Sequence, residues 1–192
     1  MAIHTIERAL RQLIRESISR PKIYVLVGPP GVGKSYWVDR NVDDPYIISR
    51  DQVVDMVRGP LGLKYDDMFG PRGREASKEA DRIHRKNKAE AAASGKNIVV
   101  DMTNMGTSSR RNALQVIKGR LDDYEKIAVF FDYRGMEQQV RRSIDKRAEQ
   151  LQDKRVRDDI LQDMFKRFEM PTREEGFDDV IVVDPSETLN RP

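Results

Sequence analysis

The sequence predicts an α/β protein in which five strands form one mainly parallel sheet between two layers of helices. Five short apolar runs, rich in valine, isoleucine and aromatic residues, recur along the chain. Segments with helical spacing of apolar residues separate these runs, and such alternation produces right-handed crossovers and a parallel sheet covered on both faces. The length of 192 residues fits one domain. We therefore expect a three-layer sandwich.

The expected strands are continuous apolar stretches, which are typical of strands buried on both faces of a parallel sheet. They cover residues 22–28, 46–49, 97–101, 126–132 and 179–184. Helical patterns cover residues 34–41, 52–58, 75–94, 108–120, 136–150 and 156–168. Glycines and prolines interrupt residues 59–74, where we expect a long surface loop.

The N-terminal segment has a different character from the rest. Ile6, Leu10, Leu13 and Ile14 stand at helical spacing, so residues 1–20 predict an amphipathic helix that docks on the core or on a second subunit. A homo-oligomer is therefore one possibility, and residues 21–192 form the single expected domain.

Composition limits the chemistry that this chain can perform. Cysteine is absent and there are two histidines, which argues against disulfides, thiolate zinc sites and all-histidine metal sites. No apolar run approaches the roughly 18 residues of a membrane span, so we expect a cytoplasmic protein without a membrane partner. Charged residues make up 35% of the chain with a net charge of +3, which only weakly favours polyanionic partners. Carboxylates, hydroxyls, lysines, arginines or a bound cation must carry the reaction.

A glycine-rich loop is the strongest motif in the sequence. GPPGVGKS, residues 28–35, fits the phosphate-loop pattern and stands between an expected strand and an expected helix. Its backbone N–H groups can surround an anion at the positive end of the helix. Lys34 would lie along the β- and γ-phosphates, and the Ser35 hydroxyl would ligate Mg²⁺. The nucleotide-binding residues expected here are Gly31, Val32, Gly33, Lys34, Ser35 and Tyr36.

Two aspartates should lie beside this loop, because the carboxyl ends of parallel strands meet in one crevice. Asp51 follows the second expected strand and could be a general base, although an aspartate at a helix start is also a common N-cap. Asp101 ends the third strand and could bind Mg²⁺ through water or orient an arginine.

Among the classes of protein that use a phosphate loop, the kinases fit best. A GTPase switch needs N-K-x-D after D-x-x-G, but here the nearest match, at residues 87–90, precedes the D-x-x-G at residues 132–135 and ends in glutamate. Motors usually end an apolar strand in paired acids, and none of the expected strands does so.

Four segments together resemble the 5′-hydroxyl polynucleotide kinase family, in particular the kinase module of phage and animal polynucleotide kinase phosphatases. They are the phosphate loop, Ser49-Arg50-Asp51, the run from Asp101 through Thr103 and Asn104 to Arg110-Arg111, and FEMPTREEGFDDVIVVD near the C-terminus. The resemblance covers about residues 22–184. It implies a P-loop kinase-like fold and transfer of the ATP γ-phosphate to the 5′-OH end of DNA or RNA, with Mg²⁺, for end repair.

The resemblance also implies roles for individual residues. Asp51 would accept the proton of the 5′-OH, with Arg50 beside it, and Asp101, Thr103 and Asn104 would help to build the site. Residues 136–157 would form a helical lid whose arginines contact phosphates, and we favour Arg142 and Arg147.

The sequence departs from this family at two points. It contains no D-x-D phosphatase motif, so we expect no 3′-phosphatase activity, and Val54 stands where some phage relatives place an acceptor-binding arginine. Acceptor binding could instead come from a basic stripe of Arg74, Lys78, Arg82 and Arg85, of which we favour the first three, although the same spacing fits a mixed-charge solvent-exposed face equally well. A kinase for a small-molecule hydroxyl and a toxin-like module that uses ATP structurally remain alternatives, and the choice between DNA and RNA stays open.

Overall fold

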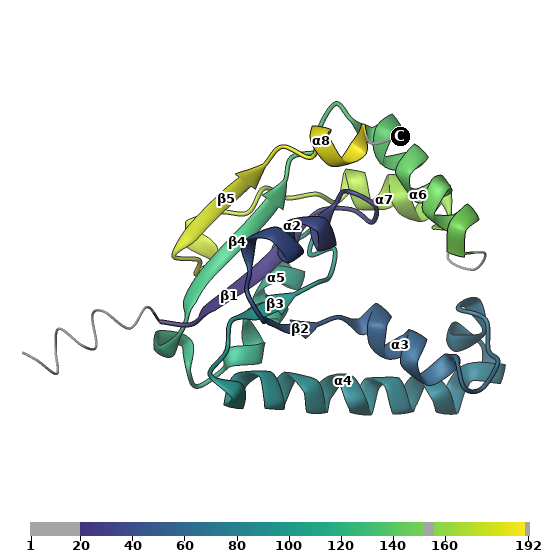
Figure 1. Ribbon diagram of the computed structural model, residues 1–192, viewed down its shortest axis with the longest axis horizontal. Coiled ribbons are helices and arrows are strands. Elements are labelled where there is room, and N and C mark those ends of the chain that lie inside the picture. Colours follow the sequence, from purple (N-terminus) through teal and green to yellow (C-terminus); the bar gives the residue numbers. More distant parts are fainter. Residues whose placement is uncertain (1–19, 152–155, 191–192) are drawn as a thin grey trace, which may run out of the picture.

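The computed structural model describes residues 20–151 and 156–190, so the helix expected over residues 1–20 lies, except for Arg20, outside the described residues. Five parallel strands form one sheet in the order β2-β3-β1-β4-β5 (Figure 1), which confirms the predicted α/β class. The strands are β1 (Lys22–Val27), β2 (Tyr46–Ile48), β3 (Ile98–Val100), β4 (Glu125–Phe131) and β5 (Asp179–Val183).

Helices cover both faces of the sheet and complete the three layers. They are α2 (Lys34–Asn41), α3 (Arg50–Arg58), α4 (Arg74–Ser94), α5 (Thr107–Leu114), α6 (Glu137–Leu151), α7 (Asp158–Lys166) and the short α8 (Ser186–Leu189). Side chains of α2, α6 and α7 pack with one set of strand residues, and side chains of α4 and α5 pack with the alternate set. Within the described ranges, no helix is long and apolar enough to cross a membrane.

The central strand explains the continuous apolar run that the sequence shows at residues 22–27. β1 pairs with β3 on one side and β4 on the other, and Ile23, Val25 and Leu26 are fully buried. Since alternate residues of a strand point to opposite faces, both helical layers require apolar partners from β1. This packing fixes the end of β1, where the glycine-rich loop begins.

The segment between α3 and α4 is more ordered than the expected surface loop. It contains two 3₁₀ turns, η1 (Asp66–Phe69) and η2 (Pro71–Gly73), and its Met68 is buried with Val53 and Val54 of α3. Gly73 permits this close packing, because a Cβ there would lie 2.3 Å from the Asp67 carbonyl oxygen. The glycines and prolines therefore build a compact connection that joins α3 to α4.

The helix expected over residues 108–120 is shorter than its periodicity suggests. α5 ends at Leu114, a 3₁₀ turn (Gln115–Ile117) follows, and Gly119 then takes a positive φ of 84°. Val116 and Ile117 are nevertheless buried. Their apolar pattern therefore reports burial correctly in a segment that is not α-helical.

Candidate active site

One cleft of about 350 Å³ opens at the carboxyl ends of β1, β2 and β3, where parallel sheets bind ligands. Four segments line it: the phosphate loop, the start of α3, the residues after β3, and one face of α6. Its lining residues are Pro30, Gly31, Gly33, Lys34, Ser35, Tyr36, Ser49, Asp51, Gln52, Asp55, Asp101, Met102, Thr103, Ser143 and Arg147.

The phosphate loop lies against the segment after β3 and against helix α8. The Gly28 N–H donates to the Thr103 carbonyl oxygen at 2.9 Å, which joins the loop to the segment after β3. Gly33 has a φ of 97°, and a Cβ there would lie 2.6 Å from Thr188 Cγ2 of α8. Only glycine satisfies both the backbone conformation and this close approach. Val32 is fully buried, so its side chain anchors the loop and its backbone is the part that can reach a phosphate.

Lys34 begins α2 and points its ammonium group back over the loop. Its Nζ donates to the carbonyl oxygens of Gly28 at 3.0 Å and Pro29 at 2.9 Å. The pKa of Lys34 is lowered to about 8, mainly by burial and in part by the neighbouring Arg147, while Asp101 and Asp51 oppose the shift. A bound triphosphate would supply the negative charge that favours the protonated form.

Asp51 lies in the first turn of α3 but does not cap that helix. Ser49 is the N-cap, and its Oγ accepts a hydrogen bond from the Gln52 N–H at 3.4 Å. The Asp51 carboxylate therefore faces the cleft with one oxygen, Oδ1, accepting a 3.0 Å hydrogen bond from the Tyr65 hydroxyl. The N-cap alternative for Asp51 does not apply in this structure.

Asp101 follows β3 directly, and its backbone N–H donates to the Ile48 carbonyl oxygen at 2.9 Å. Burial raises the pKa of its carboxyl group, although the Lys34 ammonium partly offsets that rise. A carboxylate this desolvated has few water partners, so a cation or a donor on a ligand would stabilise it.

Ser35 and Asp101, the Mg²⁺ ligands expected from the sequence, both line this cleft. Among the residues that the structure describes, no group of three or more histidine, cysteine, aspartate or glutamate side chains could hold a metal, in this cleft or outside it. Mg²⁺ usually takes one or two protein oxygens, several waters and the substrate phosphates, so a hydroxyl and a carboxylate beside the phosphate loop fit it.

Of the acceptor residues expected from the sequence, Thr103 lines the cleft, while Asn104 and Arg50 do not. Asn104 is buried with a left-handed φ of 46°, and its amide donates to the Leu26 carbonyl oxygen at 2.8 Å. It thereby fixes the segment after β3 against β1. Arg50 forms an ion pair with Asp81 of α4 at 2.6 Å.

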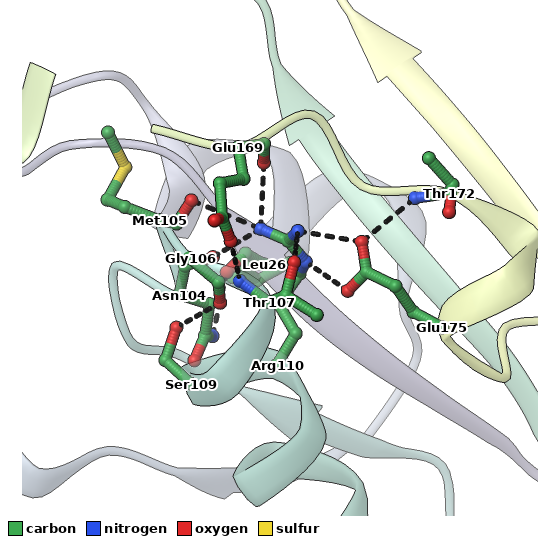
Figure 2. A network of polar contacts seen from close by, with 10 residues as sticks. All are labelled: Leu26, Asn104, Met105, Gly106, Thr107, Ser109, Arg110, Glu169, Thr172 and Glu175. Carbon is green, nitrogen blue, oxygen red and sulfur yellow. Dashed lines mark hydrogen bonds and ion pairs between the residues drawn. The ribbon is translucent and has the colours of Figure 1, made fainter. Parts of the chain in front are cut away.

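A buried arginine holds the next part of that segment (Figure 2). Arg110 is fully buried and binds both carboxylate oxygens of Glu175 at 2.7 Å. Its Nη1 donates to the carbonyl oxygens of Asn104 and Met105 at 3.1 Å and of Glu169 at 2.9 Å. Arg110 and the FEMPTREEG stretch belong to two of the four segments that carry the family resemblance. They meet in one network, which supports the cleft without lining it.

Helix α6 contributes two residues one turn apart to the cleft, Ser143 and Arg147. The Ser143 Oγ donates to the Gly31 carbonyl oxygen at 2.8 Å, so α6 contacts the phosphate loop directly. Ile144, next to it, is buried in the core. Arg142 is exposed and is not among the lining residues, so the structure separates the two lid arginines favoured from the sequence.

The basic stripe on α4 does not reach the cleft lining. Lys78 pairs with Glu75 at 2.8 Å and Arg82 pairs with Glu79 at 2.6 Å, both in exposed ion pairs. Arg74 is exposed at the start of the helix.

Sequence reasoning missed three polar residues of the cleft, Gln52, Asp55 and Ser143. Asp55 could have been found, because it stands four residues after Asp51 and shares its helix face. Ser143 could not, since its place depends on how α6 packs against the phosphate loop.

Comparison with known proteins agrees with this architecture. A family model described as an AAA domain matches residues 23–171. A candidate kinase from Chloroflexus aurantiacus superposes with a TM-score of 0.60 at 14% identity, covering 91% of each chain. A structure from the PezAT chromosomal toxin-antitoxin system of Streptococcus pneumoniae gives 0.54 at 18% identity, covering 95% of this chain and 76% of that one. No curated protein matches the sequence significantly.

Proposed function

The chain belongs to the P-loop kinase-like AAA domain family, and from that premise we propose that it transfers the γ-phosphate of ATP to the 5′-hydroxyl end of DNA or RNA. Nucleotide-dependent phosphoryl transfer agrees with the family and with the fold. The polynucleotide acceptor is our inference from the four sequence segments described above.

One observation carries the kinase proposal: a carboxylate that caps no helix, Asp51, lines the same cleft as the phosphate loop, Lys34 and Arg147. Phosphoryl transfer needs a positioned carboxylate at the acceptor hydroxyl and cations at the transferring group. The acceptor oxygen would attack the γ-phosphorus, its proton would pass to Asp51, and the bond to the β-phosphate oxygen would break to release ADP. Lys34 and Arg147 would neutralise charge on the phosphates.

Mg²⁺, when bound, would supply further charge neutralisation on the phosphates. Ser35 and Asp101, which both line the cleft, would hold it. Lys34, with its desolvated ammonium group, would also bind and orient the phosphates.

Replacement of the proposed base tests this mechanism. Asp51→Asn keeps the side-chain shape and an oxygen for Tyr65, but it removes the proton acceptor. We expect transfer to fall by about 10²-fold to 10⁴-fold while ATP binding is kept. Turnover would be measured with radiolabelled ATP, and unaltered turnover would remove Asp51 from the mechanism.

Matched acceptors test the substrate class. Incubation with labelled ATP, Mg²⁺ and either a 5′-OH oligonucleotide, the same oligonucleotide bearing a 5′-phosphate, or free nucleosides and sugars should label the first alone. Labelling of nucleosides or sugars only would contradict the polynucleotide proposal and leave the kinase proposal intact.

The second candidate is a kinase for a small-molecule hydroxyl, and the structure offers a specific observation in its favour. Helix α3, which carries the proposed base, contributes Asp51, Gln52 and Asp55 to the cleft lining; we call these three residues the acceptor wall. Arg74, Lys78 and Arg82 lie outside the lining. Polar and acidic groups suit a neutral or cationic acceptor better than a phosphodiester chain.

A further inference from the structure

The hydroxyl of Tyr65 contacts the proposed base, Asp51, and neither the fold nor the proposed reaction explains this contact. Tyr65 belongs to the connection between α3 and α4, which the sequence suggests is an irregular loop. Its hydroxyl nevertheless donates to Asp51 Oδ1 at 3.0 Å. Asp51 lines the cleft and Tyr65 does not, so the phenol approaches the carboxylate from outside the space that an acceptor would occupy.

The connection between α3 and α4 fixes Tyr65 through several contacts. The Tyr65 carbonyl oxygen accepts a hydrogen bond from the Met68 N–H at 3.2 Å, and Met68 is buried. The Tyr65 ring packs on the apolar cluster that Val53 and Val54 of α3 form with Met68. The Arg58 guanidinium lies 5.9 Å from the centre of the ring. A side chain held at this many points can orient its hydrogen-bond partner.

We propose that Tyr65 is a positioning residue that binds one oxygen of the Asp51 carboxylate and thereby presents the other oxygen to the acceptor hydroxyl. This inference rests on the proposed role of Asp51 as the base. Ser49 fixes the backbone of Asp51 by capping α3, but the carboxylate can still rotate about its own side-chain bonds. The Tyr65 hydrogen bond removes that freedom, and a correctly oriented base reacts faster than a rotating one.

The protonation state of Tyr65 agrees with a donor role. Burial raises the pKa of Tyr65 to about 12, and the neighbouring Asp51 carboxylate contributes to the rise. The phenol therefore stays protonated, and able to donate, through the pH range in which a carboxylate base works.

The substitution Tyr65→Phe tests the inference, since it keeps the ring and removes the hydroxyl. With Mg²⁺, ATP and a 5′-OH oligonucleotide, we expect kcat to fall about tenfold while the KM for ATP stays within about twofold of the unaltered protein. Melting temperature and ATP affinity report that the fold is retained. The matched control is Tyr46→Phe, because the Tyr46 hydroxyl also donates to a carboxylate, that of Glu90 at 3.1 Å, away from the cleft.

The pH profile of kcat separates positioning from simple packing. A carboxylate that loses a hydrogen-bond donor holds its proton more tightly, so the acidic limb of the profile should move to higher pH in Tyr65→Phe. The charged groups around Asp51 and Tyr65 stay in place in this variant. They are Arg50, Asp55 and Arg58 on α3, Lys34 at the start of α2, Asp101 after β3 and Arg147 on α6.

The possible outcomes distinguish this inference from the proposed function. An inactive Asp51→Asn variant beside a Tyr65→Phe variant with unchanged kcat and pH profile would overturn the role of Tyr65 alone. A higher kcat/KM for the acceptor in Tyr65→Phe would also overturn it, since the phenol would then occupy the acceptor position. Should Asp51→Asn keep full turnover, the proposed base itself would be wrong. If only small molecules were phosphorylated, the polynucleotide proposal would be wrong. The role of Tyr65 would then be tested with the same variants on those acceptors.

Discussion

Lys34 illustrates how a single partly buried charge couples nucleotide binding to pH. Without a ligand its ammonium group is satisfied by two loop carbonyl oxygens, and burial brings its pKa down to about 8. Phosphate binding favours the protonated form, so binding above this pH must be accompanied by proton uptake.

We expect ATP affinity to fall as pH rises through about 8, because the unliganded protein must then gain a proton to bind. The decrease should be about tenfold between pH 7 and pH 9, measured by calorimetry without Mg²⁺. Lys34→Arg, which stays charged in this range, should bind with little dependence on pH. A flat profile in the unaltered protein would show that Lys34 stays charged up to pH 9.

The position of Asp51 could be predicted from the sequence, but its hydrogen bonds could not. Its place just after the second strand predicted a residue in the cleft, and the structure puts it there. The choice between base and N-cap depended on whether the neighbouring Ser49 turned its hydroxyl to the helix, which the order of residues alone does not decide. The contact with Tyr65 depends on the path of a glycine-rich connection and could not be predicted either.

Among the helices, α6 makes the contact with the phosphate loop that bears most on catalysis. Ser143 bonds to the loop, Ile144 packs in the core, and Arg147 lines the cleft one turn after Ser143. Arg142 is not among the residues that line the cleft. A guanidinium that lines the cleft and can reach the phosphates should stabilise charge in the transition state far more than one outside it.

Arg147→Ala should therefore lower kcat by about 10²-fold to 10³-fold, with a much smaller change for Arg142→Ala. Steady-state kinetics with saturating Mg²⁺ and ATP would check this difference. Equal losses in both variants would mean that α6 presents a different face to bound nucleotide.

The Arg110 network connects the segment after β3 to the C-terminal part of the chain. Glu175 receives two hydrogen bonds from a fully buried guanidinium, so neutralising Glu175 would leave that charge without its counter-ion. Removing one partner of a buried ion pair typically costs about 3–5 kcal/mol.

We expect Glu175→Gln to lose about 3 kcal/mol of unfolding free energy, measured by urea denaturation. Glu174→Gln is the matched control, because Glu174 is exposed and should change stability by less than about 0.5 kcal/mol. Equal stability of the two variants would show that the Arg110 network contributes little to the fold.

For the molecule as a whole, the alternation of strands and helices was enough to predict the sheet. All five strands lie where apolar runs indicated them. The three inner strands, β3, β1 and β4, need apolar residues on both faces because they lie between two helical layers, whereas the edge strands β2 and β5 leave Ile47 and Val182 exposed. The short helix α8 was not predicted, since four residues carry no clear period. Its Thr188 still contacts the phosphate loop at Gly33, a contact between segments about 150 residues apart that emerges only from the tertiary fold.

Helix α4 is the surface on which binding of a polynucleotide acceptor can be tested. If a polynucleotide runs from the cleft across α4, the exposed pairs of Lys78 with Glu75 and Arg82 with Glu79 would not prevent it. Exposed ion pairs are worth at most about 1 kcal/mol, so a phosphate can replace the glutamate. Counter-ion release would then make binding depend steeply on salt.

A triple variant of α4, with Arg74, Lys78 and Arg82 each changed to alanine, tests this path. We expect the KM for a 5′-OH oligonucleotide to rise and the slope of log KM against log salt to fall by about 2, since each lost phosphate contact to a single strand contributes about 0.7. The KM for ATP should stay unchanged, because none of the three residues lines the cleft. Lys86→Ala, on the same helix but outside the stripe, controls for general loss of charge. An unaltered slope in the triple variant would exclude α4 from acceptor binding, and the acidic wall of Asp51, Gln52 and Asp55 would then favour a small-molecule acceptor.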